Sequence, residues 1–127
     1  MIFGIGTDIV RISRIQQSLD RYGDRFARRI LAGQELADLQ RTPYPARFLA
    51  RRFAAKEAVV KAYGTGFTQG MTFQDIAIGH DAAGKPLLLL SGRALELQHE
   101  LRIGEMFISI SDEQEYAVAF VTLLKAS

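Results

Sequence analysis

The chain of 127 residues has no cysteine and no apolar run that approaches the length of a bilayer span. Without cysteine it forms neither a disulfide framework nor a thiolate metal site, which fits a reducing compartment. A membrane span needs about 20 consecutive apolar residues, so we expect no membrane partner. The run from Met1 to Ile5 is too short and too uncharged for a signal peptide. We therefore predict a cytoplasmic protein.

Histidine is scarce as well. The two histidines, His80 and His99, are isolated from each other, and we expect both at the surface. No Ser-His-Asp or Cys-His arrangement is visible, and no Gly-Lys-Ser/Thr follows a glycine at the spacing of a P-loop. The common signatures of hydrolases and of P-loop nucleotide hydrolysis are therefore missing.

The length and the 48% hydrophobic content fit one domain spanning residues 1–127. The net charge of +2 hides an asymmetry along the chain. Residues 1–61 hold 12 Lys and Arg against 6 Asp and Glu, whereas residues 62–127 hold 4 against 8. This split indicates a basic surface for an acidic partner, unless the opposite charges pair within the folded chain.

Local patterning predicts an α+β fold in which helices pack on one mostly antiparallel sheet. The most strongly helical segment, residues 46–63, is rich in alanine and is followed by Gly64, a residue typical of helix ends. We expect strands at 2–7, 73–78, 87–90, 106–110 and 116–124, and helices at 12–31 with a break at Gly23, at 33–39, at 46–63 and at 92–101.

Two carboxylates and a lysine are the first candidates for chemistry. Asp8 follows the first predicted strand, and Glu57 lies one helical turn before Lys61. Two carboxylates without a nearby histidine or cysteine suit a hard cation such as Mg²⁺, and the ammonium group suits a phosphate. The alternative is that Asp8 caps the following helix and that Glu57 pairs with Lys61 on a solvated surface.

A glycine-flanked turn and a row of arginines are the other candidates. Gly64-Thr65-Gly66 would let backbone approach a ligand, or would simply end the helix. If the break at Gly23 is mild, five arginines fall on one broad helical face: Arg11, Arg14, Arg21, Arg25 and Arg28. Such a row grips acidic side chains or phosphates, although a run of charge is also typical of an ordinary solvated surface.

Two motifs together give a resemblance to a known family. The run from Gly4 to Val10, and the run from Arg52 through Glu57 and Lys61 to Gly66, resemble the signatures of holo-acyl-carrier-protein synthase, the small stand-alone class of 4′-phosphopantetheinyl transferases. The resemblance covers essentially the whole chain. It implies transfer of the 4′-phosphopantetheine arm of coenzyme A to a serine of apo-acyl carrier protein, in support of fatty acid biosynthesis, with release of adenosine 3′,5′-bisphosphate.

The resemblance also implies roles for individual residues. Asp8 and Glu57 match the Mg²⁺ ligands, and Lys61 matches the lysine at the reacting phosphates. Glu57, or a water at the metal, would accept the serine proton. The family forms homotrimers with sites between subunits. The other implied contacts are Arg52, Lys61, Gly64, Thr65 and Gly66 for coenzyme A, and Arg14, Arg21 and Arg25 for the acidic carrier protein.

One departure and one competing function remain. Many family members carry histidines on and just after the strand that corresponds to residues 107–111, where this chain has Phe107 and Asp112. The competing function is a small nucleic-acid-binding domain that uses the arginines for phosphates. The thinly scattered aromatic residues argue against this alternative, since they offer no platform for stacking bases.

Overall fold

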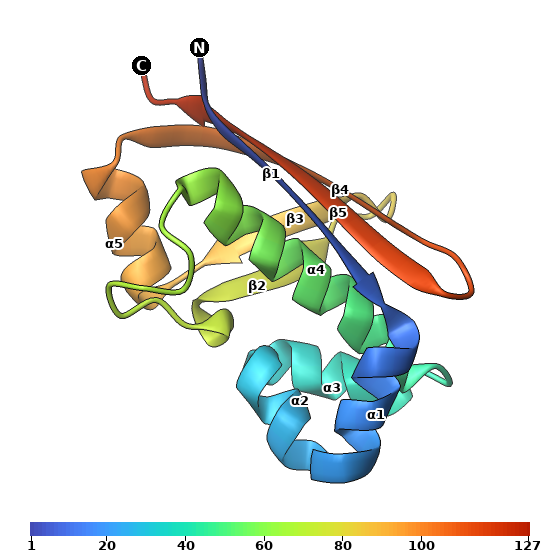
Figure 1. The fold of residues 1–127 in the computed structure, drawn as a ribbon. Coiled ribbons are helices and arrows are strands. Elements are labelled where there is room, and N and C mark those ends of the chain that lie inside the picture. Colours follow the sequence, from blue (N-terminus) through green and yellow to red (C-terminus); the bar gives the residue numbers. More distant parts are fainter.

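The computed structural model describes residues 1–127, and its elements follow one another in the order β1-α1-α2-α3-α4-β2-β3-α5-β4-β5 (Figure 1). The three longest strands form an antiparallel sheet in the order β1-β5-β4, with β5 in the centre. The strands are β1 Ile2–Arg11, β2 Ile76–His80, β3 Pro86–Leu90, β4 Ile103–Asp112 and β5 Tyr116–Lys125. The helices are α1 Ile12–Tyr22, α2 Asp24–Ile30, α3 Gly33–Arg41, α4 Pro45–Tyr63 and α5 Gly92–Glu100, and a short 3₁₀ turn covers Phe73–Asp75.

Helix α4 is the element around which the rest of the chain packs. Pro45 occupies its first turn, where a missing N–H costs nothing, and Gly64 ends it in the left-handed region at φ 84°. Figure 1 shows α4 lying across the sheet, with α1, α2 and α3 gathered at its N-terminal end and α5 beside its C-terminal end. None of the helices combines the length and apolarity that a bilayer crossing demands.

Two glycines of β1 allow the strand to lie directly against α4. A Cβ atom at Gly4 would overlap the carbonyl oxygen of Ala62, and one at Gly6 would overlap that of Ala58. Only glycine fits at such a backbone contact. The glycines of the N-terminal motif therefore bring strand and helix together, and this contact lies beside Asp8.

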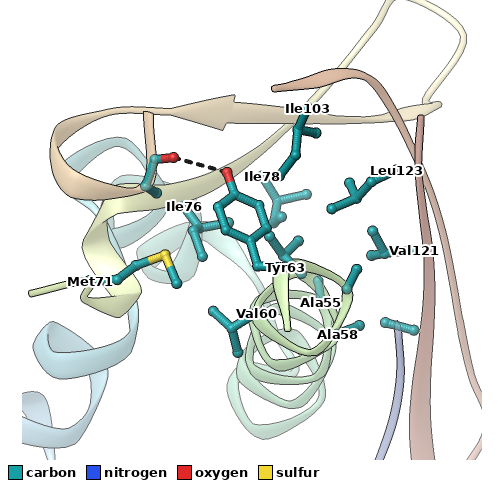
Figure 2. Close-up of a cluster of buried hydrophobic side chains, with 14 of the residues drawn as sticks. Ala55, Ala58, Val60, Tyr63, Met71, Ile76, Ile78, Ile103, Val121 and Leu123 are labelled. Carbon is teal, nitrogen blue, oxygen red and sulfur yellow. Dashed lines mark hydrogen bonds between the residues drawn. The ribbon is translucent and has the colours of Figure 1, made fainter. Parts of the chain in front are cut away.

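The larger core lies between α4, the sheet, the β2–β3 hairpin and α5. Figure 2 shows the side chains of Tyr63, Ile76, Ile78, Val121 and Leu123 converging on one another. The Tyr63 hydroxyl donates a hydrogen bond to the carbonyl oxygen of Ala94 in α5 at 2.9 Å. Burial raises the pKa of Tyr63 to about 12, so the phenol keeps the proton that it donates.

The predicted α+β class is confirmed, and three local predictions are corrected. The strands do not form one sheet, because β2 and β3 pair only with each other. The segment 73–78 begins as a 3₁₀ turn, since the Asp75 carboxylate accepts a hydrogen bond from the backbone N–H of Thr72 and bends the chain before β2. Strand β1 continues past Thr7 to Arg11 because its pairing with β5 continues to Tyr116.

Candidate active site

Asp8 and Lys61 meet where β1 crosses the C-terminal half of α4. The Lys61 Nζ donates to the Asp8 Oδ1 at 2.9 Å and to the Thr7 carbonyl oxygen at 3.0 Å. The Asp8 side chain is 15% exposed and that of Lys61 is 52% exposed, so the pair lies at the surface. Asp8 lies inside β1 rather than at its end, and α1 has no side-chain cap, which removes the helix-cap alternative for this residue.

Glu57 lies one helical turn before Lys61 and close enough to Asp8 for the two carboxylates to interact. Partial burial and then the negative charge of Asp8 raise the pKa of Glu57, while the Lys61 ammonium opposes both effects. Lys61 forms its ion pair with Asp8 and not with Glu57, contrary to the alternative of a simple surface pair within the helix. The structure therefore brings together the three residues that the sequence separates by up to 53 positions.

The donor set at this point is suited to a small hard cation. The carboxylates of Asp8 on β1 and Glu57 on α4 are close enough to interact, and Mg²⁺ usually takes only one or two protein carboxylates, with water and substrate oxygens completing its shell. No group of three or more His, Cys, Asp or Glu side chains gathers anywhere in the structure to hold a metal by itself. A magnesium ion fits Asp8 and Glu57, provided that a ligand supplies further oxygen atoms.

The turn after α4 lies next to these groups along the chain. Gly64 and Gly66 have φ angles of 84° and 64°, which favour glycine, and a Cβ atom at either would meet open space. The Thr65 hydroxyl donates to the Gly66 carbonyl oxygen at 3.0 Å. The turn thus exposes backbone to solvent just beyond Lys61.

Arg52 lies in a buried network that the sequence did not reveal. Its side chain is 5% exposed, and its Nη1 donates to the Glu35 Oε2 at 3.0 Å and to the Ile78 carbonyl oxygen at 2.9 Å. The guanidinium also lies over the Phe48 ring, 4.4 Å from the ring centre. Its Nε and second Nη form no hydrogen bond within the chain. Because no fully buried side-chain nitrogen or oxygen in the structure lacks a hydrogen-bond partner, these two atoms keep some contact with solvent, and this edge of the guanidinium is open.

Glu35 is the centre of this network. Its two oxygens accept four hydrogen bonds, from Arg52, from the backbone N–H groups of Ala32 and Ile78, and from the Lys56 Nζ at 2.6 Å. Lys56 is fully buried and also donates to the Ile30 carbonyl oxygen. Burial lowers the pKa of Lys56, and the adjacent Glu35 carboxylate opposes this effect. The network joins α2, α3, α4 and β2.

A surface hollow lies at the β4 edge of the structure. Arg51 and Arg52 line it together with His80 and with Asp112 at the end of β4. The Asp112 carboxylate pairs with Arg47 at 3.4 Å and with Arg51 at 3.5 Å. Sequence reasoning missed this cluster; the i,i+4 spacing of Arg47 and Arg51 was the one available signal.

The predicted carrier-protein face is exposed. Arg14 and Arg21 lie on α1 and Arg25 lies on α2, and none of the three forms an ion pair within the chain. The Arg21 guanidinium lies over the Tyr22 ring, 5.3 Å from its centre. These charges are free to meet an external partner.

The face of the sheet that points away from α4 is unusually apolar. All three strands contribute exposed apolar side chains to it: Ile5 and Ile9 of β1, Val118 and Phe120 of β5, and Phe107 of β4. Ile9 and Val118 are direct register partners, whereas Thr7, Ser109 and Thr122 stand between the others. The exposed fractions of these apolar side chains run from 37% for Val118 to 65% for Ile9. Several large exposed apolar side chains on one face of a sheet are typical of an interface between proteins.

Known proteins share this fold and these motifs. The sequence model of the 4′-phosphopantetheinyl transferase superfamily matches residues 4–121. A holo-[acyl-carrier-protein] synthase of Vibrio cholerae serotype O1 is 54% identical over 123 residues, covering 97% of this chain and 98% of the relative. The crystal structure of the synthase from Neisseria meningitidis has 43% identity and a TM-score of 0.94, and covers 98% of this chain and 100% of its own.

A further solved structure, the holo-(acyl-carrier-protein) synthase of Bacillus anthracis in complex with CoA (3′,5′-ADP), has 38% identity and a TM-score of 0.82 over 100% of this chain and 99% of its own. The chain therefore belongs to the 4′-phosphopantetheinyl transferase superfamily. Within that superfamily it falls in the family of the holo-[acyl-carrier-protein] synthases. The resemblance found in the sequence is confirmed.

Proposed function

We propose that this protein transfers the 4′-phosphopantetheine group of coenzyme A to a serine of apo-acyl carrier protein and thereby supports fatty acid biosynthesis. The observation that carries the proposal is the meeting of Asp8, Glu57 and Lys61 beside the exposed turn at Gly64. Family membership supplies the substrates, because the relatives are named for the carrier protein and one solved relative holds CoA (3′,5′-ADP).

The reaction is a phosphoryl transfer. The serine oxygen forms a bond to the phosphorus that carries the pantetheine arm, and the bond from that phosphorus to the bridging pyrophosphate oxygen breaks. Adenosine 3′,5′-bisphosphate leaves with the electron pair of that bond, and the serine hydroxyl loses a proton. Positioning of the reactants and stabilisation of the developing negative charge supply most of the rate enhancement in such a reaction.

We assign the charge stabilisation to Asp8, Glu57 and Lys61. Asp8 and Glu57 would hold Mg²⁺, which would neutralise pyrophosphate oxygens. Lys61 is half exposed, so its ammonium group reaches a phosphate at the surface of the site. Glu57, or a water at the metal, is the candidate acceptor of the serine proton.

Coenzyme A would be bound at two places. The turn at Gly64, Thr65 and Gly66 offers backbone groups to the phosphates near Lys61. The open edge of the Arg52 guanidinium, in the hollow at the β4 edge, offers a second contact for an anionic part of the coenzyme. Asp8 lies on β1 at one edge of the sheet, and the hollow with Arg52 lies at β4, the other edge. A coenzyme that contacts both the site at Asp8 and Arg52 is therefore most simply shared between two subunits.

A homotrimer with sites between subunits is part of the same proposal. The exposed apolar face of β1, β5 and β4 is the surface that such an assembly would cover. We expect a mass in solution of three times that of the chain, measured by sedimentation equilibrium. Phe120→Glu, in the centre of this face, should give a folded monomer that has lost most of its transfer activity.

Leu89→Glu is the matched control, since it places the same charge on an exposed leucine of β3 outside that face. A Phe120→Glu variant that keeps both the wild-type mass and the wild-type activity would contradict the trimer.

A cytoplasmic location remains a prediction from the sequence alone.

The central test is the mass of an apo-acyl carrier protein after incubation with the protein, coenzyme A and Mg²⁺. We expect the carrier to gain one phosphopantetheine group, and we expect the gain to stop when the metal is chelated. A carrier of unchanged mass under all conditions would overturn the proposed function. A salt-dependent gel shift with generic DNA or RNA, without transfer, would favour the nucleic-acid-binding alternative.

The arginines of α1 are expected to decide how well the carrier protein binds. Arg14→Glu or Arg21→Glu should raise the KM for the carrier about tenfold or more, because reversed charge repels an acidic partner and slows its association. Coenzyme A binding, measured by calorimetry, should be unchanged. Arg102→Glu, an equal charge change on the turn before β4, is the control. An equal loss of carrier and coenzyme affinity would contradict this role.

A further inference from the structure

The hollow at the β4 edge contains a histidine to which the proposed transfer gives no role. His80 is the last residue of β2, and it lines the hollow with Arg51, Arg52 and Asp112. The imidazole is exposed, so it lies at the surface as predicted, but it is not isolated. It stands among charges contributed by α4 and β4.

The alternation of β2 explains why His80 faces these charges. Ile76 and Ile78 point into the core, and His80 is the next residue on that side, where the strand passes beyond the core. Arg52 donates to the carbonyl oxygen of Ile78 at 2.9 Å. This bond fixes its guanidinium against β2, at the residue two positions before His80. An anion that contacts the open edge of Arg52 therefore also lies within the surroundings of the imidazole.

We propose that His80 is a proton-linked contact for a phosphate group: an anion bound in this hollow is held together with a proton on the imidazole. The inference rests on the proposed function, which places an anionic part of coenzyme A beside Arg52. It goes further by naming the residue whose protonation depends on the charge of the bound ligand. It also predicts that the affinity of the coenzyme depends on pH through this residue.

The charges around His80 set the direction of that dependence. Partial burial of the ring, and then the positive charges of Arg52 and Arg51, lower its pKa, whereas Asp38 of α3 and Asp81 of the following turn oppose them. Asp112 of β4 also lines the hollow, but its charge is shared by Arg47 and Arg51. In the free protein at pH 7 the imidazole is therefore neutral.

A bound phosphate reverses this balance. Its negative charge offsets the arginines and gives the imidazolium an acceptor, so the pKa of His80 rises on binding. Each unit by which it rises makes binding about tenfold tighter at a pH below both pKa values. The added affinity is present at low pH and is lost as the pH rises through the pKa of the bound form.

The chain has only two histidines, which makes the test direct. We would follow the imidazole signals of both by NMR as the pH changes, with and without saturating adenosine 3′,5′-bisphosphate, and assign them with His80→Gln. The ligand should raise the pKa of His80 by at least about one unit. His99, exposed on α5, should titrate identically in both samples.

Calorimetry in two buffers of different ionisation enthalpy then counts the protons taken up on binding. Wild type and His99→Gln should take up more protons than His80→Gln at pH 7. His80→Gln should bind the bisphosphate severalfold more weakly than wild type at pH 6 and equally well at pH 8.5. The phosphate of the ligand also titrates near pH 6, but it does so in all three proteins, so the difference between them isolates His80.

An unchanged pKa of His80 at saturation, or equal proton uptake by His80→Gln and wild type, would overturn this inference. Transfer to the carrier protein would still proceed in that case, and the proposed function would stand. A wild-type protein that fails to bind the bisphosphate would overturn both the inference and the coenzyme contact at Arg52. A carrier of unchanged mass would instead overturn the proposed function itself.

Discussion

Replacing Glu57 with glutamine, or Asp8 with asparagine, is expected to lower the rate of phosphopantetheine transfer by roughly 10²–10³-fold or more in a folded protein. Each change removes one of the two negative charges that would hold Mg²⁺ beside the reacting phosphates. The exchange of carboxylate for amide keeps the shape of the side chain, so the packing of β1 on α4 should survive. Single-turnover rates at saturating coenzyme A and carrier protein measure the loss.

Two further measurements separate the metal assignment from general damage. Calorimetric titration with Mg²⁺ in the presence of coenzyme A should show weakened binding in both variants. Glu105→Gln, which removes an exposed carboxylate on β4, should keep wild-type rates and metal affinity. Full activity in the Glu57 or the Asp8 variant would remove that residue from the site.

Lys61 forms two hydrogen bonds at Asp8, and they refine the result expected for Asp8→Asn. Its ammonium group donates to the Asp8 carboxylate and to the backbone of the same strand. In Asp8→Asn the lysine keeps its bond to the Thr7 carbonyl oxygen but loses its charged partner. A variant that loses metal affinity while keeping coenzyme A affinity would therefore indicate that Lys61 still reaches the phosphates without Asp8.

Replacing Glu35 with alanine is expected to destabilise the protein by about 3–5 kcal/mol. The change deletes four hydrogen bonds and leaves the charges of Lys56 and Arg52 without their counter-ion inside the protein. An unpaired buried charge costs far more than the pair contributes. Urea unfolding followed by circular dichroism measures the free energy of unfolding.

A combined variant tests the physical reason for that loss. Glu35→Leu together with Lys56→Met and Arg52→Met removes the charges as well as their partner, so much of the lost stability should return. The combined variant should nevertheless bind coenzyme A weakly, because Arg52 is absent. A loss of less than about 1 kcal/mol in Glu35→Ala would mean that water or movement of α3 satisfies the buried lysine.

Much of the fold could be predicted because its signals are local. The alanine-rich run, Pro45 and Gly64 define α4, and the turn before Pro86 defines the β2–β3 hairpin. The 3₁₀ turn at Phe73 was not predictable from alternation, since the bond between Thr72 and Asp75 that bends the chain competes with strand pairing. The separation of the strands into two sheets depends on contacts between distant segments.

The candidate site was predictable only in part, for the same reason. The residue types of Asp8, Glu57 and Lys61 indicate metal and phosphate chemistry, but no spacing rule places a strand residue against a helix residue about 50 positions away. Family resemblance supplied that link. The contact of Arg52 with Glu35 could not be predicted from the sequence. Nothing near Arg52 in the chain indicates that its guanidinium donates a hydrogen bond to a buried glutamate on another helix.

The contact of Gly4 and Gly6 with the carbonyl oxygens of α4 has a consequence for how this protein tolerates change. The spacing between strand and helix beside Asp8 and Glu57 is set by main chain resting on main chain, with no side chain in between. Substitutions in the hydrophobic core that leave this backbone contact intact should therefore lower the stability of the protein without moving the two carboxylates apart. A side chain at Gly4 or Gly6 would instead push the strand away from the helix and change the distance between the two carboxylates.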